Sequence, residues 1–88
     1  MIDPHRVLEQ AGAIIGERGA DYGRIEDNFD RIAQIYYQVG GEFFDNYDVA
    51  MMMVCVKLAR IRQSPKKRDN YVDAINYLAF ACELLEAE

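Results

Sequence analysis

Apolar residues recur every three or four positions through most of this chain, the spacing that one buried face of an α-helix requires. The first helix is predicted to begin at Asp3 and Pro4, which have the form of an N-cap followed by proline at the first helical position. Gly19 is placed to end this helix. A second helix is predicted over about 25–39, closed by the glycine pair that follows it.

A helical hairpin organises the second half of the chain. Its first arm, about 46–63, is apolar on every side over 49–56, a pattern that a helix tolerates when it is buried all round, so we expect this arm to be the central helix. Pro65 lies in the turn, because proline cannot continue a helix. The second arm covers about 68–86. Its expected core side comprises Val72, Ile75, Leu78, Ala79, Cys82 and Leu85.

The capping signals of the hairpin are local. Asp45 or Asn46 is placed to cap the first arm, and Asp48 completes an arrangement similar to a capping box. Together with the two helices before it, the hairpin predicts an all-α, four-helix bundle-like domain over residues 1–88.

Polar residues interrupt the apolar hairpin. If the arms pack antiparallel about the turn, Lys57 lies near Asp73, and Arg60 lies near Asp69 and Asn70. One interpretation is a network of ion pairs and hydrogen bonds that holds the hairpin. The other is a site for phosphate and metal, with Lys57 and Arg60 as its floor and a basic turn as its mouth. The basic turn contains Lys66, Lys67 and Arg68, and the polar stripe of the second arm contains Asp69, Asp73, Asn76 and Tyr77.

The stretch 18–24 is predicted to be a loop. Glycine backbone and the arginine side chains of Arg18 and Arg24 are suited to phosphate, and Tyr22 is suited to stacking on a base. The alternative is a plain connector in which Asp21 caps the next helix.

Acidic residues suggest a metal site. Glu26 and Asp30 lie four apart, so their carboxylates could share a divalent ion with Asp69 and Asp73 from another helix. The structural alternative is that acids in a first turn stabilise the helix dipole.

Composition narrows the class of protein. Eighty-eight residues that are 51% hydrophobic suggest a homo-oligomer, with a well-packed monomer as the alternative. A net charge of −5 argues against a duplex nucleic-acid binder and against a polybasic membrane patch. Cys55 and Cys82 fall in apolar runs and are expected to be reduced core residues, which favours the cytoplasm. No signal peptide and no apolar run long enough for a membrane span are recognised.

The order of motifs resembles a family of small phage and prophage proteins of unknown function. The motifs are Arg18-Gly19-x-Asp21-Tyr22-Gly23, Glu26-x-Asn28-Phe29-x-Arg31-Ile32-Ala33, Asp48-Val49-Ala50-x-Met52-Met53, Lys57-Leu58-Ala59-Arg60 and Arg68-Asp69-Asn70-x-x-Asp73-x-x-x-Tyr77. A looser resemblance links the chain to phage domains associated with nucleotide modification and, more distantly, to MazG-type all-α nucleoside triphosphate pyrophosphohydrolases. The latter hold magnesium with Glu-x-x-Glu and Glu-x-x-Asp pairs. This chain departs from that pattern, because Glu42-x-x-Asp45 falls in a predicted loop and Glu83-x-x-Glu86 at a helix end.

We therefore expect a nucleotide or a related phosphorylated small molecule as ligand, bound during phage infection in the host cytoplasm. Whether the ligand is turned over is left open: binding alone would make the protein a sponge or sensor, turnover would give it a role in nucleotide metabolism, and no catalytic residue is assigned. In this hypothesis Asp69 and Asp73 orient the basic side chains or a magnesium ion, and the alternative of a divergent pyrophosphohydrolase requires magnesium. A further alternative is a protein-interaction module directed at a host protein. The expected ligand-binding residues are Arg18, Asp21, Tyr22, Arg24, Lys57, Arg60, Arg68, Asp69, Asn70, Asp73 and Tyr77.

Overall fold

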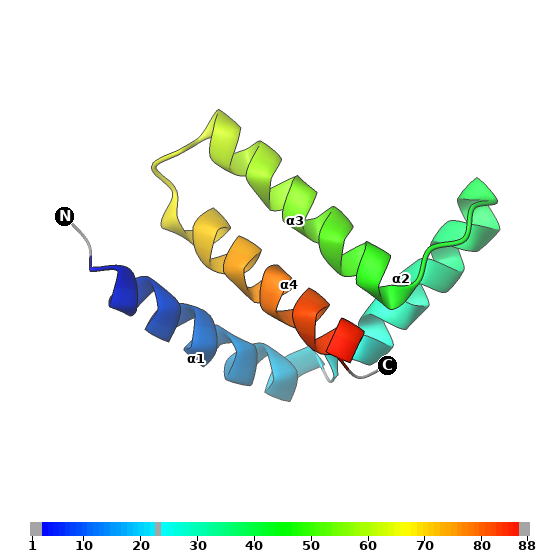
Figure 1. The fold of residues 1–88 in the computed structure, drawn as a ribbon, viewed down its shortest axis with the longest axis horizontal. Coiled ribbons are helices and arrows are strands. Elements are labelled where there is room, and N and C mark those ends of the chain that lie inside the picture. The colour runs from blue at the N-terminus through cyan, green and yellow to red at the C-terminus, as the bar shows by residue number, and fades with distance from the viewer. Residues whose placement is uncertain (1–2, 23, 87–88) are drawn as a thin grey trace.

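The computed structural model describes residues 3–22 and 24–86, and within 18–22 it describes only the course of the backbone. These residues form helices and no strands, which confirms the predicted all-α class. The helices are α1 (Pro4–Tyr22), α2 (Ile25–Gly40), α3 (Asn46–Gln63) and α4 (Arg68–Glu86), shown in Figure 1.

The predicted hairpin is confirmed in α3 and α4, which run antiparallel side by side (Figure 1). The start of α3 carries the expected capping box. The backbone N–H of Asp48 donates to Asp45 Oδ1 at 2.8 Å, and the N–H of Asp45 donates to Asp48 Oδ2 at 3.2 Å. Two backbone donors that the helix itself leaves unpaired are thereby satisfied.

The central helix is α4, and the prediction that the first arm of the hairpin is central is wrong. α4 lies between α1 and α3, whereas α3 contacts α4 along one side and α2 near its beginning (Figure 1). The outer face of α3 is therefore open: Met52 is 49% exposed, and Cys55 and Val56 are exposed beside it. An apolar helix is buried all round only if neighbours cover every face, and one chain provides too few.

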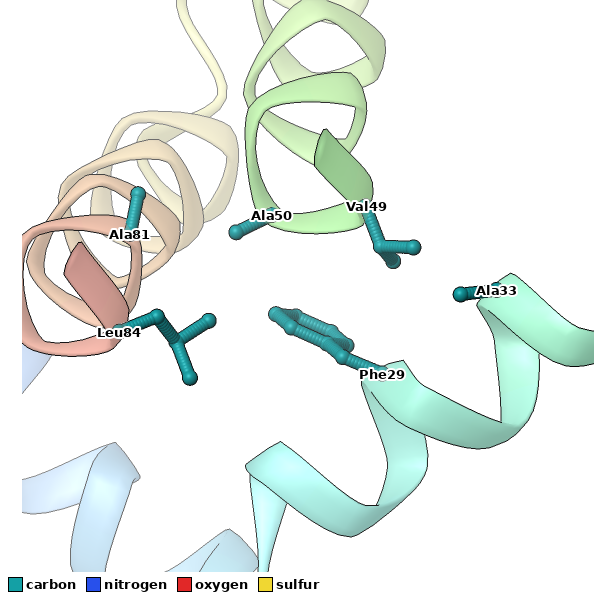
Figure 2. Packing of buried hydrophobic residues seen from close by; sticks show 6 residues of the cluster. All are labelled: Phe29, Ala33, Val49, Ala50, Ala81 and Leu84. Atoms are coloured by element: carbon teal, nitrogen blue, oxygen red, sulfur yellow. The ribbon is translucent and has the colours of Figure 1, made fainter. Parts of the chain in front are cut away.

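The hydrophobic core joins α2, α3 and α4 at the end opposite the hairpin turn (Figure 2). Phe29 lies at its centre, 2% exposed, and points between α3 and α4. Small residues, which include Ala50 and Ala81, allow the helix backbones to approach closely around its ring. The buried cluster comprises Phe29, Ala33, Val49, Ala50, Ala81 and Leu84.

The buried face of α4 differs from the predicted one. The predicted core residues Leu78, Ala79, Cys82 and Leu85 are exposed, while Val72 is fully buried as expected. Cys55 and Cys82 are free thiols, but both are exposed, so their placement in the core is wrong. Apolar residues occupy two sides of α4. The side that also carries Asp73 and Asn76 is the buried one, because its polar groups find hydrogen-bond or ion-pair partners there. The buried residues of α4 are Val72, Asp73, Ala74, Asn76, Ala81 and Leu84.

The predicted loop over 18–24 is mostly helical. α1 continues past Gly19 to Tyr22, since a glycine inside a helix costs only about 1 kcal/mol relative to alanine. Asp21 therefore lies within α1, and its predicted role as the cap of the next helix is wrong. Arg24 holds the N-cap position of α2, with extended backbone and no capping side-chain hydrogen bond.

Candidate functional site

The polar seam predicted between the hairpin arms is present. Lys57 Nζ lies 3.0 Å from Asp73 Oδ2, and the two side chains are only 11% and 10% exposed. Asn76 is buried one turn further along α4. Within the described part of the chain, no buried side-chain nitrogen or oxygen lacks a hydrogen-bond partner. Lys57 and Asp73 thus neutralise each other inside the hairpin, which fits the structural interpretation of the seam.

The other predicted members of the seam are more open. Arg60 and Asp69 are exposed, and Asn70 is half-buried. Tyr77 is half-buried, and its ring stacks on Phe29 with ring centroids 6.1 Å apart. Tyr77 therefore contributes to the core, where aromatic pairs of this geometry are favourable.

A groove lies on the opposite side of α4, between the beginning of α1 and the hairpin turn. We call it the α1–α4 groove; its volume is about 600 Å³. One rim carries Lys66 and Arg68, and apolar side chains with one tyrosine supply the remaining lining. The lining residues are Pro4, Val7, Leu8, Lys66, Arg68, Tyr71 and Ile75.

Hydrogen bonds hold two side chains of this groove. The Tyr71 hydroxyl donates to the carbonyl oxygen of Pro65 at 2.9 Å, which ties the ring to the turn. Arg68 Nη1 lies 3.5 Å from Gln10 Oε1 on α1, so the Arg68 side chain extends from α4 toward α1. A fixed aromatic ring and a cation at one rim form an arrangement suited to a ligand with both an apolar and an anionic part.

The end of the molecule at the hairpin turn is rich in basic side chains, although the chain as a whole is acidic. α1 and α4 begin here and α3 ends here, so two partly positive helix N-termini and one partly negative C-terminus meet at this end. Lys66, Lys67 and Arg68 follow one another at the turn, and Arg60 and Arg62 lie in the last turn of α3. Basic side chains therefore gather at this end, although the chain as a whole carries a net charge of −5.

Sequence reasoning placed more residues in one site than the structure brings together. Arg24 is exposed and paired with Glu26 at 2.9 Å, at the far end of the molecule from the turn. The side chains of Arg18, Asp21 and Tyr22 lie outside the described residues. The predicted ligand set thus separates into the far end, the buried seam and the groove.

The four acids predicted to share a metal do not converge. Glu26 and Asp30 flank Phe29, which packs against Leu84. Asp73 lies about 16 Å along α4 from Leu84, at a rise of about 1.5 Å per residue, and Asp69 lies one turn further away. Among residues 3–22 and 24–86, as far as their side chains are described, no three histidine, cysteine or acidic side chains are grouped as metal ligands would be.

A second groove, of about 680 Å³, lies between α2 and the loop that leads to α3. We call it the α2 groove. Tyr37, Phe43 and Phe44 line it together with Asp30, and no lysine or arginine does. Its chemistry is therefore apolar and weakly acidic, unlike that of the α1–α4 groove.

The lining residues that the sequence analysis did not assign to a site are Pro4, Val7, Leu8, Tyr71 and Ile75. Tyr71 had a local signal, since it lies three residues after Arg68 and so shares its helix face. Leu8 had none, because its place depends on how α1 docks on α4.

The fold and the groove define a small all-α domain with a cleft at one end that Lys66 and Arg68 help to line. The chain belongs to the family described as Domain of unknown function (DUF6378), whose sequence model matches residues 6–85. It is similar to the Gene 55 protein of Mycobacterium phage L5, at 39% identity over 74 residues that make up 81% of this chain and 47% of that protein. It is also similar to the Gene 55 protein of Mycobacterium phage D29, at 33% identity over 72 residues, 81% of this chain and 48% of that protein.

These findings confirm the resemblance to small phage proteins of unknown function. The chain spans about half the length of the curated relatives it matches. No solved structure matches it. In the part of the chain that the structure describes, every helix falls short of the length or the apolar character needed to cross a membrane.

Proposed function

We propose that this domain binds a phosphorylated small molecule, most simply a nucleotide, in the α1–α4 groove. The observation that carries the proposal is the meeting of Lys66 and Arg68 with the fixed ring of Tyr71 in one cleft of about 600 Å³. Phosphate recognition needs cations and donors, and a base needs a flat apolar surface. This groove offers both within one cleft.

In the proposed complex, Arg68 and Lys66 bind the phosphate oxygens at the rim. Tyr71 stacks on the base, and Leu8 closes the apolar side from α1. The buried pair of Lys57 and Asp73 has a positioning role, since it fixes α4 against α3 and so sets the direction of the groove-lining face. Arg60 lies near the same end and adds to its positive potential.

Two considerations favour a nucleotide over other phosphorylated molecules. The stacking surface suits a base, and the sequence resembles phage domains associated with nucleotide modification. The mycobacteriophage relatives support a role during phage infection. If the domain binds a nucleotide without turning it over, it would act as a nucleotide sponge or sensor. A divergent magnesium-dependent pyrophosphohydrolase and an interaction module for a host protein are the alternatives that the experiment separates.

The proposal is tested by thermal unfolding of the purified protein with nucleoside mono-, di- and triphosphates, cyclic dinucleotides and inorganic phosphate, each with and without magnesium. A ligand at 100 times its dissociation constant adds about 2.7 kcal/mol, which raises the Tm by several degrees in a domain of this size. We expect nucleotides to stabilise the protein and inorganic phosphate to do so far less, because it lacks the base.

A matched pair of variants locates the binding. Arg68→Ala and Lys66→Ala should abolish the stabilisation, whereas Lys67→Ala should keep most of it, since Lys67 carries the same charge next to the groove but does not line it. Equal loss in all three variants would indicate diffuse charge attraction. No stabilisation by any ligand would refute the proposal and direct attention to a protein partner, and a shift that needs magnesium would favour the hydrolase.

A further inference from the structure

The second half of α2 projects away from the rest of the domain (Figure 1). The first half packs into the core through Phe29 and Ala33. Tyr36 stacks on Phe44 of the following loop, with ring centroids 4.5 Å apart, which covers one side of the projecting half. The neighbouring apolar side of this half is exposed.

That side carries a regular stripe of exposed apolar residues, Ile32, Ile35 and Val39, which we call the α2 seam. Ile35 is 53% exposed and Val39 is 84% exposed. Their spacing of three and then four residues is the spacing at which a helix packs along a partner helix. No charged side chain interrupts the stripe. In a single chain it is therefore a continuous apolar strip that is exposed to water.

The exposed surface of the chain is larger than expected for a compact monomer. A folded monomer of this mass is expected to expose about 5,300 Å², whereas this chain exposes 6644 Å². The excess of about 1,300 Å² is more than the roughly 800 Å² that each partner buries in a standard interface. The radius of gyration, 14.0 Å, also exceeds the about 12 Å of a compact domain of this length. The chain therefore has the surface that one subunit of a dimer would have before assembly.

We infer that the protein forms a homodimer in which the α2 seam packs against the same seam of a second copy. A twofold axis brings identical patches together, so a stripe of apolar residues with coiled-coil spacing is complementary to itself. The dimer leaves the α1–α4 groove free, since that groove is built from α1, the hairpin turn and α4.

The test is sedimentation equilibrium of the wild-type protein, followed by a matched pair of variants. The wild type is expected at twice the 10.1 kDa of one chain. Ile35→Glu should raise the dissociation constant at least about tenfold, because it places a carboxylate in the centre of the seam. Gln34→Glu introduces the same charge at the neighbouring, exposed position on another face of α2 and should leave the dimer intact. A monomeric wild type, or equal effects of the two substitutions, would overturn the proposal.

Two further readouts keep the test decisive if Ile35→Glu fails to fold. The Tm of the wild type should rise with protein concentration, as it does for any associating chain, and a constant Tm would contradict the dimer. Cys55 and Cys82 lie on α3 and α4, away from the seam, and both are exposed. Each should react readily with a thiol reagent in the assembled protein. Protection of either cysteine would place the interface on its helix and overturn the assignment to α2.

Discussion

Replacing Asp73 by alanine should be among the most damaging substitutions in the protein. The carboxylate lies 3.0 Å from the ammonium of Lys57, and both side chains are about nine-tenths removed from water. Asp73→Ala leaves the Lys57 charge in the hairpin without its partner. Breaking a buried pair from one side costs about 3 to 5 kcal/mol. The total free energy of unfolding of a domain this size is about 4 to 13 kcal/mol, so a large part of it is at stake.

The assay is urea unfolding followed by far-UV circular dichroism, at one fixed protein concentration. Glu83→Ala is the matched control, since it removes one acid from an exposed position of the same helix and should change the free energy of unfolding by no more than about 0.5 kcal/mol. Replacing both members of the pair, Lys57→Met with Asp73→Leu, should recover most of the loss, because it removes both charges from the interior.

A cost for Asp73→Ala as small as that for Glu83→Ala would refute the reasoning, since it would mean that Lys57 and Asp73 are solvated. A double variant no more stable than Asp73→Ala alone would show that the energetic cost does not come from the unpaired charge of Lys57.

Further predictions, at Asp45, Gly12 and Gly41, concern the helices and their ends and are measured by the same unfolding assay. Asp45→Ala should lower the free energy of unfolding by about 1 kcal/mol because it removes the side chain that accepts from the N–H of Asp48, and Asp45→Asn, which can still accept, should cost much less; equal costs for both would contradict the capping role. Gly12→Ala should stabilise the protein by about 0.5 to 1 kcal/mol, since no atom lies within 4 Å of the added Cβ inside α1. Gly41→Ala should destabilise it by about 1 kcal/mol, because the φ of 75° closes α2 in the left-handed region even though space is free; the same sign for both substitutions would refute this account.

The hairpin could be predicted from the sequence because its signals are local. Asp45 and Asp48 mark the start of α3, Pro65 marks the turn, and antiparallel packing about that turn brings Lys57 to Asp73. None of these inferences needs knowledge of where the other helices lie.

The identity of the central helix could not be predicted, because it depends on where α1 docks. α3 and α4 are both apolar on more than one side, so their periodicity alone does not say which face meets a neighbour. On α4 the buried face carries Asp73 and Asn76, which polarity alone places at the surface. The burial of Asp73 is explained by its partner Lys57, which comes from the other arm of the hairpin.

Part of the candidate site could be predicted, because one of its rims has a local signal in the sequence. Lys66 and Arg68 stand out as a basic turn in an acidic chain, and the turn does form one rim of the groove. The other wall includes Val7 and Leu8, which come from the first turns of α1 and meet α4 only through tertiary packing. Spacing along the chain carries no information about such a contact.

The most direct test of the account is a titration of the isotope-labelled protein with a nucleoside triphosphate, followed by two-dimensional NMR of the backbone amides. Binding in the α1–α4 groove should cause saturable shifts at residues that line it, Leu8, Lys66, Arg68 and Tyr71, with little change at Phe43 and Phe44 in the α2 groove. Shifts confined to the α2 groove, or no saturable shift at all, would contradict the proposed nucleotide site.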